Sequence, residues 1–201
     1  MKIRLDIFGE NHPDLALSYN NIGSIYNSQG DYPKALEYYE KALKILLDIF
    51  GENHPDVAMS YNNIGVVYDS QGNYPKALEY FEKSLKIRLE ILGENHPDVA
   101  ESYNNIGDVY KSHEDYTQAL EYYEKALKIR LDLLGENHPD VVTSYTNIGS
   151  AYGSQGDYTK ALEYYNKALK IQSDIFGENH PNVAVYYHII TGIYMIAKNK
   201  M

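Results

Sequence analysis

The pentapeptide Gly-Glu-Asn-His-Pro occurs five times in the chain at a constant spacing of 42 residues. Its copies begin at Gly9, Gly51, Gly93, Gly135 and Gly177. A fixed period of this length is typical of stacked supersecondary units, in which each unit packs mainly against its neighbours. No linker or change in composition interrupts the period, so the sequence predicts a single array over residues 1–201.

Each period is predicted to form two helices. The first helix begins at Asn-His-Pro-Asp, where Pro13 suits the first helical turn and Asp14 complements the positive end of the helix dipole. It ends before Gly30, a residue that readily takes the left-handed conformation of a helix stop. Asp31 then serves as the N-cap of the second helix, which Gly51 closes.

The predicted fold is therefore all-α, with every repeat contributing one helix pair. It consists of a partial helix over residues 1–8, four pairs over residues 9–50, 51–92, 93–134 and 135–176, and a terminal helix over residues 177–201. One turn departs from the pattern, because Glu114 replaces the glycine in the third repeat. A non-glycine residue in the left-handed region costs about 1–2 kcal/mol, so we expect this turn to be reshaped.

Composition excludes several classes of function. The chain has 18 basic and 28 acidic residues, a formal net charge of -10, which argues against nucleic acid or an anionic membrane as a partner. The absence of cysteine excludes disulfides, thiolate metal sites and a cysteine nucleophile. No apolar run suits a signal peptide or a membrane span, so we expect a soluble protein of the cytoplasm.

The five histidines of the repeat are the best candidates for chemistry, and they fail as a metal site. They are His12, His54, His96, His138 and His180. Zinc ligands lie about 2.0–2.1 Å from one ion, whereas equivalent residues of stacked repeats lie on the order of 10 Å apart. Each His-Pro is therefore interpreted as a helix start. The sequence contains no phosphate-binding loop, dinucleotide turn or nucleophile elbow, so we expect no cofactor, no metal and no enzymatic activity.

Helix propensity does not explain a pair of asparagines in the middle of the first helices. Asn20-Asn21 returns as Asn62-Asn63 and Asn104-Asn105, and Asn147 keeps the second place in the fourth repeat. Seven such residues cost on the order of 4 kcal/mol of helix propensity. At about 100° per residue Asn21 lies on the side opposite Tyr19, Ile22, Gly23 and Tyr26, which form the predicted core face, and Asn20 flanks that side.

The repeat resembles the tetratricopeptide (TPR) family. The residues that carry the resemblance are Tyr19, Ile22, Gly23 and Tyr26 on the first helix and Ala35, Tyr39 and Ala42 on the second. The 42-residue length and the flanking Asn-His-Pro-Asp-Val-Ala resemble the kinesin-light-chain type more closely than the common 34-residue form. The resemblance implies a right-handed α-solenoid of antiparallel helix pairs and a non-catalytic protein-interaction scaffold.

In the family, first helices line a concave face that holds an extended peptide. The residues that the resemblance places on this face are Asn20, Asn21, Ser24, Asn62, Asn63, Val66, Asp69, Glu101, Asn104, Asn105, Asp108, Lys111 and Asn147. An asparagine amide both donates and accepts, so it can satisfy the main chain of an extended peptide. The middle of the face is acidic, with Lys111 as its one basic residue, and this favours a ligand that carries Lys or Arg.

Two alternatives remain open. The amides could bond to one another or to the next helix, in which case they only stiffen the stack. The ends of the array could also stack head to tail on a second copy, because residues 1–8 match the tail of the helix type that is missing after the terminal helix. That terminal helix offers an apolar face with no second helix to cover it, formed by Val185, Tyr186, Ile189, Ile190, Ile193 and Ile196.

Overall fold

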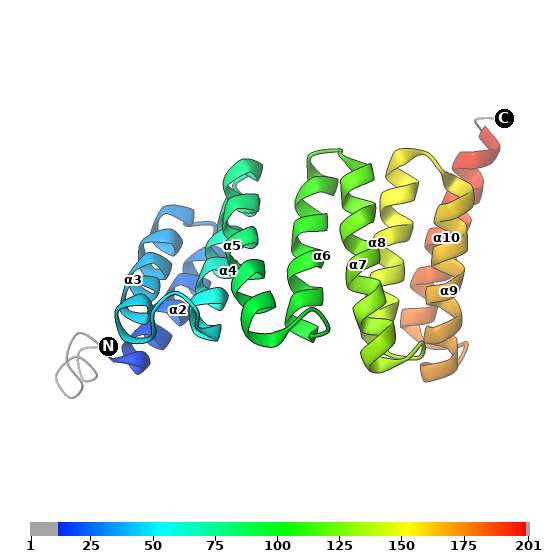
Figure 1. Ribbon diagram of the computed structural model, residues 1–201. Coiled ribbons are helices and arrows are strands. Elements are labelled where there is room, and N and C mark those ends of the chain that lie inside the picture. The colour runs from blue at the N-terminus through cyan, green and yellow to red at the C-terminus, as the bar shows by residue number, and fades with distance from the viewer. Residues whose placement is uncertain (1–11, 200–201) are drawn as a thin grey trace. The chain divides into compact units, whose positions relative to one another are not determined.

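The computed structural model describes residues 12–199, and these form an all-α fold without strands (Figure 1). The helix predicted over residues 1–8 lies outside the described part. No helix within it is long and apolar enough to cross a membrane. The helices are α2 (Pro13–Ser28), α3 (Tyr32–Phe50), α4 (Pro55–Ser70), α5 (Tyr74–Leu92), α6 (Pro97–Ser112), α7 (Tyr116–Leu134), α8 (Pro139–Gln155), α9 (Tyr158–Phe176) and α10 (Pro181–Asn199).

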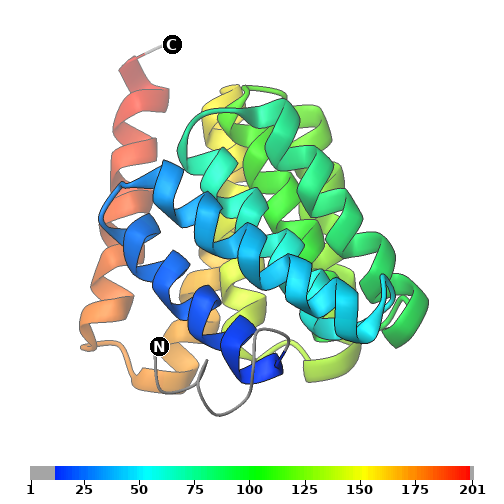
Figure 2. The same ribbon diagram turned by 90° about the vertical axis from the view of Figure 1, so that its left-hand side faces the viewer.

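The chain divides into two compact units, residues 1–94 and residues 95–201. In the first unit α2 packs on α3, α3 on α4 and α4 on α5. Figure 2 faces the α2–α3 pair and shows its two helices side by side. In the second unit the same succession runs from α6 to α10. The helix pairs of the sequence prediction are confirmed, and the single array over residues 1–201 remains a prediction.

Each first helix starts as the His-Pro pattern predicts. The Nδ1 atoms of His12, His54 and His138 each accept a hydrogen bond of 3.2 Å from the backbone N–H two residues further on. The same bond is formed by His96, at 3.1 Å, and by His180, at 3.2 Å. This bond satisfies one of the amide groups that a helix N-terminus leaves without a partner. The histidines are therefore caps, and proline follows each of them in the first turn.

The turn between the two helices of a pair depends on one residue with positive φ. Gly30 has a φ of 75°, and the N–H of Asp31 donates to the carbonyl of Tyr26 at 2.9 Å. Glu114 takes a φ of 64°, and the N–H of Asp115 donates to the carbonyl of Tyr110, also at 2.9 Å. The expected reshaping of this turn is wrong. The same hydrogen bond holds the turn, and Glu114 adopts the strained conformation.

The two helices of a pair approach closely because glycine faces an aromatic ring. A Cβ atom added at Gly23 would lie 2.9 Å from the ring of Tyr39, and one added at Gly107 would lie 2.7 Å from the ring of Tyr123. Both distances are shorter than a van der Waals contact. A side chain larger than that of glycine would therefore prevent this approach.

The terminal helix α10 is covered on one side. Ile190 is buried in a cluster with Ala161 and Tyr165 of α9, and Tyr186, Ile189 and Ile193 pack against the same cluster. The expectation that these four residues of α10 lie uncovered is therefore wrong, since α9 covers them. Val183 of α10 is fully buried as well, whereas five apolar side chains of this helix are 48–66% exposed, namely Val185, Tyr187, Tyr194, Met195 and Ile196.

Candidate peptide-binding face

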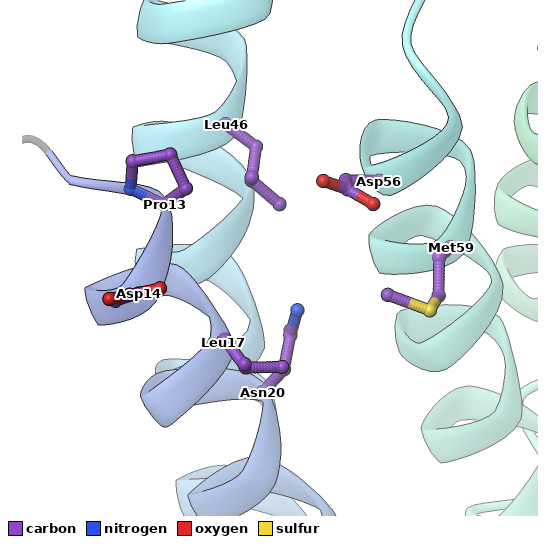
Figure 3. Close-up of a pocket in the computed structure, with 7 residues that line it drawn as sticks. All are labelled: Pro13, Asp14, Leu17, Asn20, Leu46, Asp56 and Met59. Carbon is purple, nitrogen blue, oxygen red and sulfur yellow. The ribbon is translucent and has the colours of Figure 1, made fainter.

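In the first unit the predicted face lies on α2 and α4, but only part of it is open. Asn21, Ser24 and Val66 are exposed, and Asn63 and Asp69 are half-buried. Asn20 and Asn62 are each only 7% exposed. Their expected position on an open stripe is wrong. For Asn20 the reason is the neighbouring first helix, because this side chain lies in the space between α2 and α4 (Figure 3).

In the second unit the amides of α6 and α8 bond to each other. Asn147 donates through Nδ2 to Oδ1 of Asn104 at 2.8 Å, and Asn104 donates through Nδ2 to Asp108 at 2.9 Å. The hydroxyl of Tyr123 donates to the other oxygen of Asp108 at 2.6 Å. These contacts join α6, α7 and α8, so at this place the amides have a structural role.

The remaining predicted residues of α6 surround this network. Glu101 is exposed, whereas Asn105, Asp108 and Lys111 are half-buried. Lys111 donates through Nζ to the hydroxyl of Ser150 on α8 at 2.7 Å. Burial raises the pKa of Asp108, while the hydrogen bond from Tyr123 and the charge of Lys111 act in the opposite direction. The charged centre of the predicted face is thus engaged within the unit.

A pocket of about 260 Å³ opens in the first unit between α2 and α4, with α3 behind it (Figure 3). It has apolar walls, since Leu17 and Met59 are 50% and 40% exposed. Two carboxylates belong to it, each in the first turn of a first helix. The lining residues are Pro13, Asp14, Leu17, Asn20, Leu46, Asp56 and Met59.

One polar atom at this pocket lacks a partner. Oδ1 of Asn20 is buried and accepts no hydrogen bond from any residue that the structure describes. Figure 3 shows the amide nitrogen of Asn20 directed into the space between α2 and α4, and the carboxylate of Asp56 extending into the same space from the other side. A buried amide without a partner costs about 1–3 kcal/mol, so a ligand that paired with it would recover part of this cost.

The second unit has a pocket of about 230 Å³ at the equivalent place, two repeats further along the chain. Asp98 and Asp140 stand where the first unit has Asp14 and Asp56. The wall differs, because Glu101 replaces Leu17 and Arg130 replaces Leu46. The lining residues are Pro97, Asp98, Glu101, Arg130, Leu133, Leu134 and Asp140.

Arg130 extends from α7 to α8 across this second pocket. Its Nη1 donates to the hydroxyl of Ser144 at 2.7 Å and to the backbone carbonyl of Asp140 at 3.3 Å. Burial lowers the pKa of the guanidinium, while the carboxylates of Asp140, Glu101 and Asp108 raise it. The acidic site in the second unit is thus occupied by a cation of the chain itself.

Sequence reasoning missed the position shared by Leu46 and Arg130. Leu46 is buried in the core of the first unit. The sequence does contain a signal for this role, because the residue at this position varies between repeats. It is Leu46, Arg88, Arg130 and Gln172 in turn. Polar replacements at a core position indicate that the surroundings contain groups to pair with.

Within residues 12–199, no group of three or more His, Asp or Glu side chains could hold a metal ion. The motifs that accompany nucleotide or nucleophile chemistry are absent from the sequence as well. What the two pockets offer is binding: carboxylates, apolar walls and, in the first unit, an amide without a partner.

Comparison with known proteins identifies the repeat. The family model for the tetratricopeptide repeat matches residues 1–48, 14–90, 56–132, 114–174 and 140–195. No curated protein sequence matches the chain. Tetratricopeptide repeat proteins generally act as protein-interaction scaffolds that bind other proteins or peptides.

Solved structures of related repeat proteins share the fold. The structure of BtubC (BKLC) from P. vanneervenii has a TM-score of 0.77 and 30% sequence identity, and covers 89% of this chain and 71% of its own. A Podosopora anserina protein described as a kinesin light chain with nearly identical TPR-like repeats has a TM-score of 0.81 and 22% identity, over 94% of this chain and 89% of its own.

The apo form of RapI is similar over 86% of this chain and 61% of its own, with a TM-score of 0.72 and 23% identity. The last two comparisons establish the fold alone. Together with the family matches, which span nearly all the sequence, they account for the α-solenoid of helix pairs. The chain belongs to the tetratricopeptide repeat family, and its structural neighbours include repeats of the kinesin-light-chain type.

Proposed function

We propose that this chain is a non-catalytic interaction scaffold that binds an extended, Lys- or Arg-bearing segment of another protein on the face of its first helices. The observation that carries the proposal is the pocket between α2 and α4, where exposed Leu17 and Met59 stand beside two carboxylates. Apolar side chains exposed on an otherwise polar face are typical of recognition surfaces.

Charge supports the same partner. The sequences of α2 and α4 contain no Lys or Arg, whereas each carries at least one aspartate. An acidic face attracts a basic segment, and the attraction is screened at distances beyond about 8 Å at physiological ionic strength. The exposed amide of Asn21 and the half-buried amide of Asn63 can pair with the main chain of such a segment.

A structural role of the amides is the alternative, and the bond between Asn104 and Asn147 favours it in the second unit. We therefore assign the binding role first to Asn21, Ser24, Asn63 and Val66 of the first unit. Buried Asn20 contributes through the pocket that it lines.

A peptide array probed with the purified chain tests this function. We expect binding to extended sequences with Lys or Arg, and weaker binding to the same sequences with Glu in their place. The paired variants Leu17→Ser and Met59→Ser, which keep the fold because both residues are exposed, should weaken binding. A preference for acidic peptides, or binding that ignores both variants, would contradict the proposal.

Self-association is a second candidate, favoured by the exposed side chains of α10. These are Val185, Tyr187, Tyr194, Met195 and Ile196. An apolar face of this kind on one copy could pack against another copy, and head-to-tail contacts of repeat arrays need not close. Sedimentation over a range of concentrations tests it. Association that disappears in the double variant Tyr194→Ser, Met195→Ser would support stacking, whereas a monomer at every concentration would end this candidate.

A further inference from the structure

We propose that the pocket between α2 and α4 is a binding subsite for one arginine side chain of the partner segment. This inference deepens the proposed function and rests on it for the source of the arginine. The pocket is lined by Asp14 and Asp56, by the apolar walls of Leu17 and Met59, and by the amide of Asn20. It requires a ligand that is positive at its tip, apolar along its stem and rich in hydrogen-bond donors.

The strongest argument is the occupant of the equivalent pocket. In the second unit the chain places its own guanidinium, that of Arg130, between the first helices and among the carboxylates of Glu101 and Asp140. In the first unit Leu46 stands at the same position of the repeat and supplies no charge. The carboxylates at the helix starts are nevertheless retained. The first pocket therefore keeps two of the three carboxylates of the second pocket and lacks its cation.

Hydrogen bonds at equivalent positions also differ between the two units. Arg130 donates to Ser144, whereas Ser60, which occupies that position in the first unit, is fully buried and its hydroxyl has no partner among the described residues. Oδ1 of Asn104 accepts from Asn147, whereas Oδ1 of Asn20 accepts nothing from residues 12–199. Two polar groups that are paired in the second unit are thus unpaired in the first.

Arginine suits this pocket better than lysine. Its guanidinium has five donors in a planar fork, so a single side chain can donate two parallel hydrogen bonds to one carboxylate, which the ammonium of lysine cannot do. Its aliphatic stem can lie against Leu17 and Met59, as long cationic side chains commonly do on apolar surface. A pocket of about 260 Å³ accommodates one such side chain but not a folded element.

Calorimetry with a matched pair of decapeptides tests the proposal. One peptide carries a single arginine among Gly, Ser and Ala residues. The other carries citrulline, which has nearly the same shape but no charge. We expect the arginine peptide to bind the wild-type chain at least about tenfold more tightly, a difference of about 1.4 kcal/mol.

Variants then place the binding in the pocket. Leu46→Arg should fill the pocket with a guanidinium of the chain, as Arg130 does, and weaken the arginine peptide by about tenfold or more. Leu46→Met conserves the side-chain volume and should leave affinity unchanged. Asp56→Asn should weaken binding about threefold to tenfold, whereas the matched change Asp140→Asn in the second unit should not. Circular dichroism and thermal unfolding establish that each variant is folded.

The outcomes separate the two proposals. Equal binding of the arginine and citrulline peptides, or an arginine peptide unaffected by both Leu46→Arg and Asp56→Asn, would overturn the subsite while leaving the scaffold function in place. Binding of N-acetyl-arginine amide at this pocket without binding of any extended peptide would keep the subsite and overturn the peptide-binding function.

Discussion

The two units of this chain each have a pocket at the same position of the repeat, share one proline and two aspartates around it, and complete it differently. In the second unit Arg130 crosses the pocket and the amides of Asn104 and Asn147 bond to each other. In the first unit Leu46 lies at the arginine position and the amide of Asn20 lacks a partner among the described residues. One pocket is completed by the chain itself, and we propose that the other binds a ligand.

Two of the substitutions between the repeats bear on this difference, namely Arg130 in place of Leu46 and Asp108 in place of Ser24. Asp108 orients Asn104 by accepting its amide N–H, and this turns Oδ1 of Asn104 toward Asn147. The first repeat has Ser24 at the position of Asp108, and this serine instead hydrogen-bonds with Tyr39. In a repeat protein, function is therefore best sought where neighbouring units differ.

The largest effect that we expect is a loss of stability that is equal in the two units. It tests whether the helix pairs themselves are built alike. Gly23→Ala and Gly107→Ala each place a Cβ atom under 3 Å from a buried aromatic ring. Each should lower the free energy of unfolding by about 2 kcal/mol, since overpacking outweighs the gain in helix propensity. Chemical denaturation measures both. A loss confined to one unit would mean that the helix pairs themselves are built differently.

The amide pair provides a second, smaller contrast. Asn147→Ala removes the donor to Oδ1 of Asn104, so it should lower the free energy of unfolding by about 1–2 kcal/mol. Asn63→Ala at the equivalent position should change it by about 0.5 kcal/mol or less, because no hydrogen bond joins Asn63 to Asn20 among the described residues. Equal losses in the two variants would contradict the comparison and favour a structural ladder throughout.

Exchanging the residues with positive φ between the two turns should change the free energy of unfolding by about 1 kcal/mol in opposite directions. Glu114→Gly should stabilise the second unit by about this amount, because glycine adopts a positive φ without the steric cost that glutamate incurs. Gly30→Glu should destabilise the first unit to a similar extent. Thermal unfolding of both variants provides the measurement, and a neutral exchange would show that the turn tolerates either residue.

The smallest effect is a dependence on pH that arises from Asp108 of the second unit. Because burial raises the pKa of Asp108 in the folded chain, the stability that its protonation provides is fully present below the unfolded pKa and is lost as pH rises through the folded pKa. The wild type should therefore lose stability relative to Asp108→Asn as pH rises from about 4 toward neutrality. Parallel pH curves for the two proteins would contradict this origin.

The sequence predicted well where the helices of each repeat start and stop and which face they bury. The helix starts at His-Pro, the glycine stops and the position of Gly23 on the core face follow from local chemistry or from the period of the helix, so they were predicted and confirmed. The turn at Glu114 was predicted wrongly. Hydrogen bonds on either side of Glu114 hold its conformation, and the conformational preference of a single residue does not include them.

Sequence was a poor guide to which amides are open. Angular position around one helix places Asn20 and Asn21 near each other, but burial depends on the distance to the next first helix. The role of Arg130 was missed for a related reason: its partners Asp140 and Ser144 lie on a different helix. Contacts between helices decide both questions, and no pattern within one helix contains them.

The most direct test of this account is a titration of the isotope-labelled chain with the single-arginine decapeptide, followed by nuclear magnetic resonance. We predict that signals of Leu17, Met59 and the Asn20 side-chain amide shift during the titration, while signals of the pocket around Arg130 do not. Shifts at the pocket around Arg130 with none at Leu17, Met59 and Asn20 would contradict the claim that the first unit holds the open site.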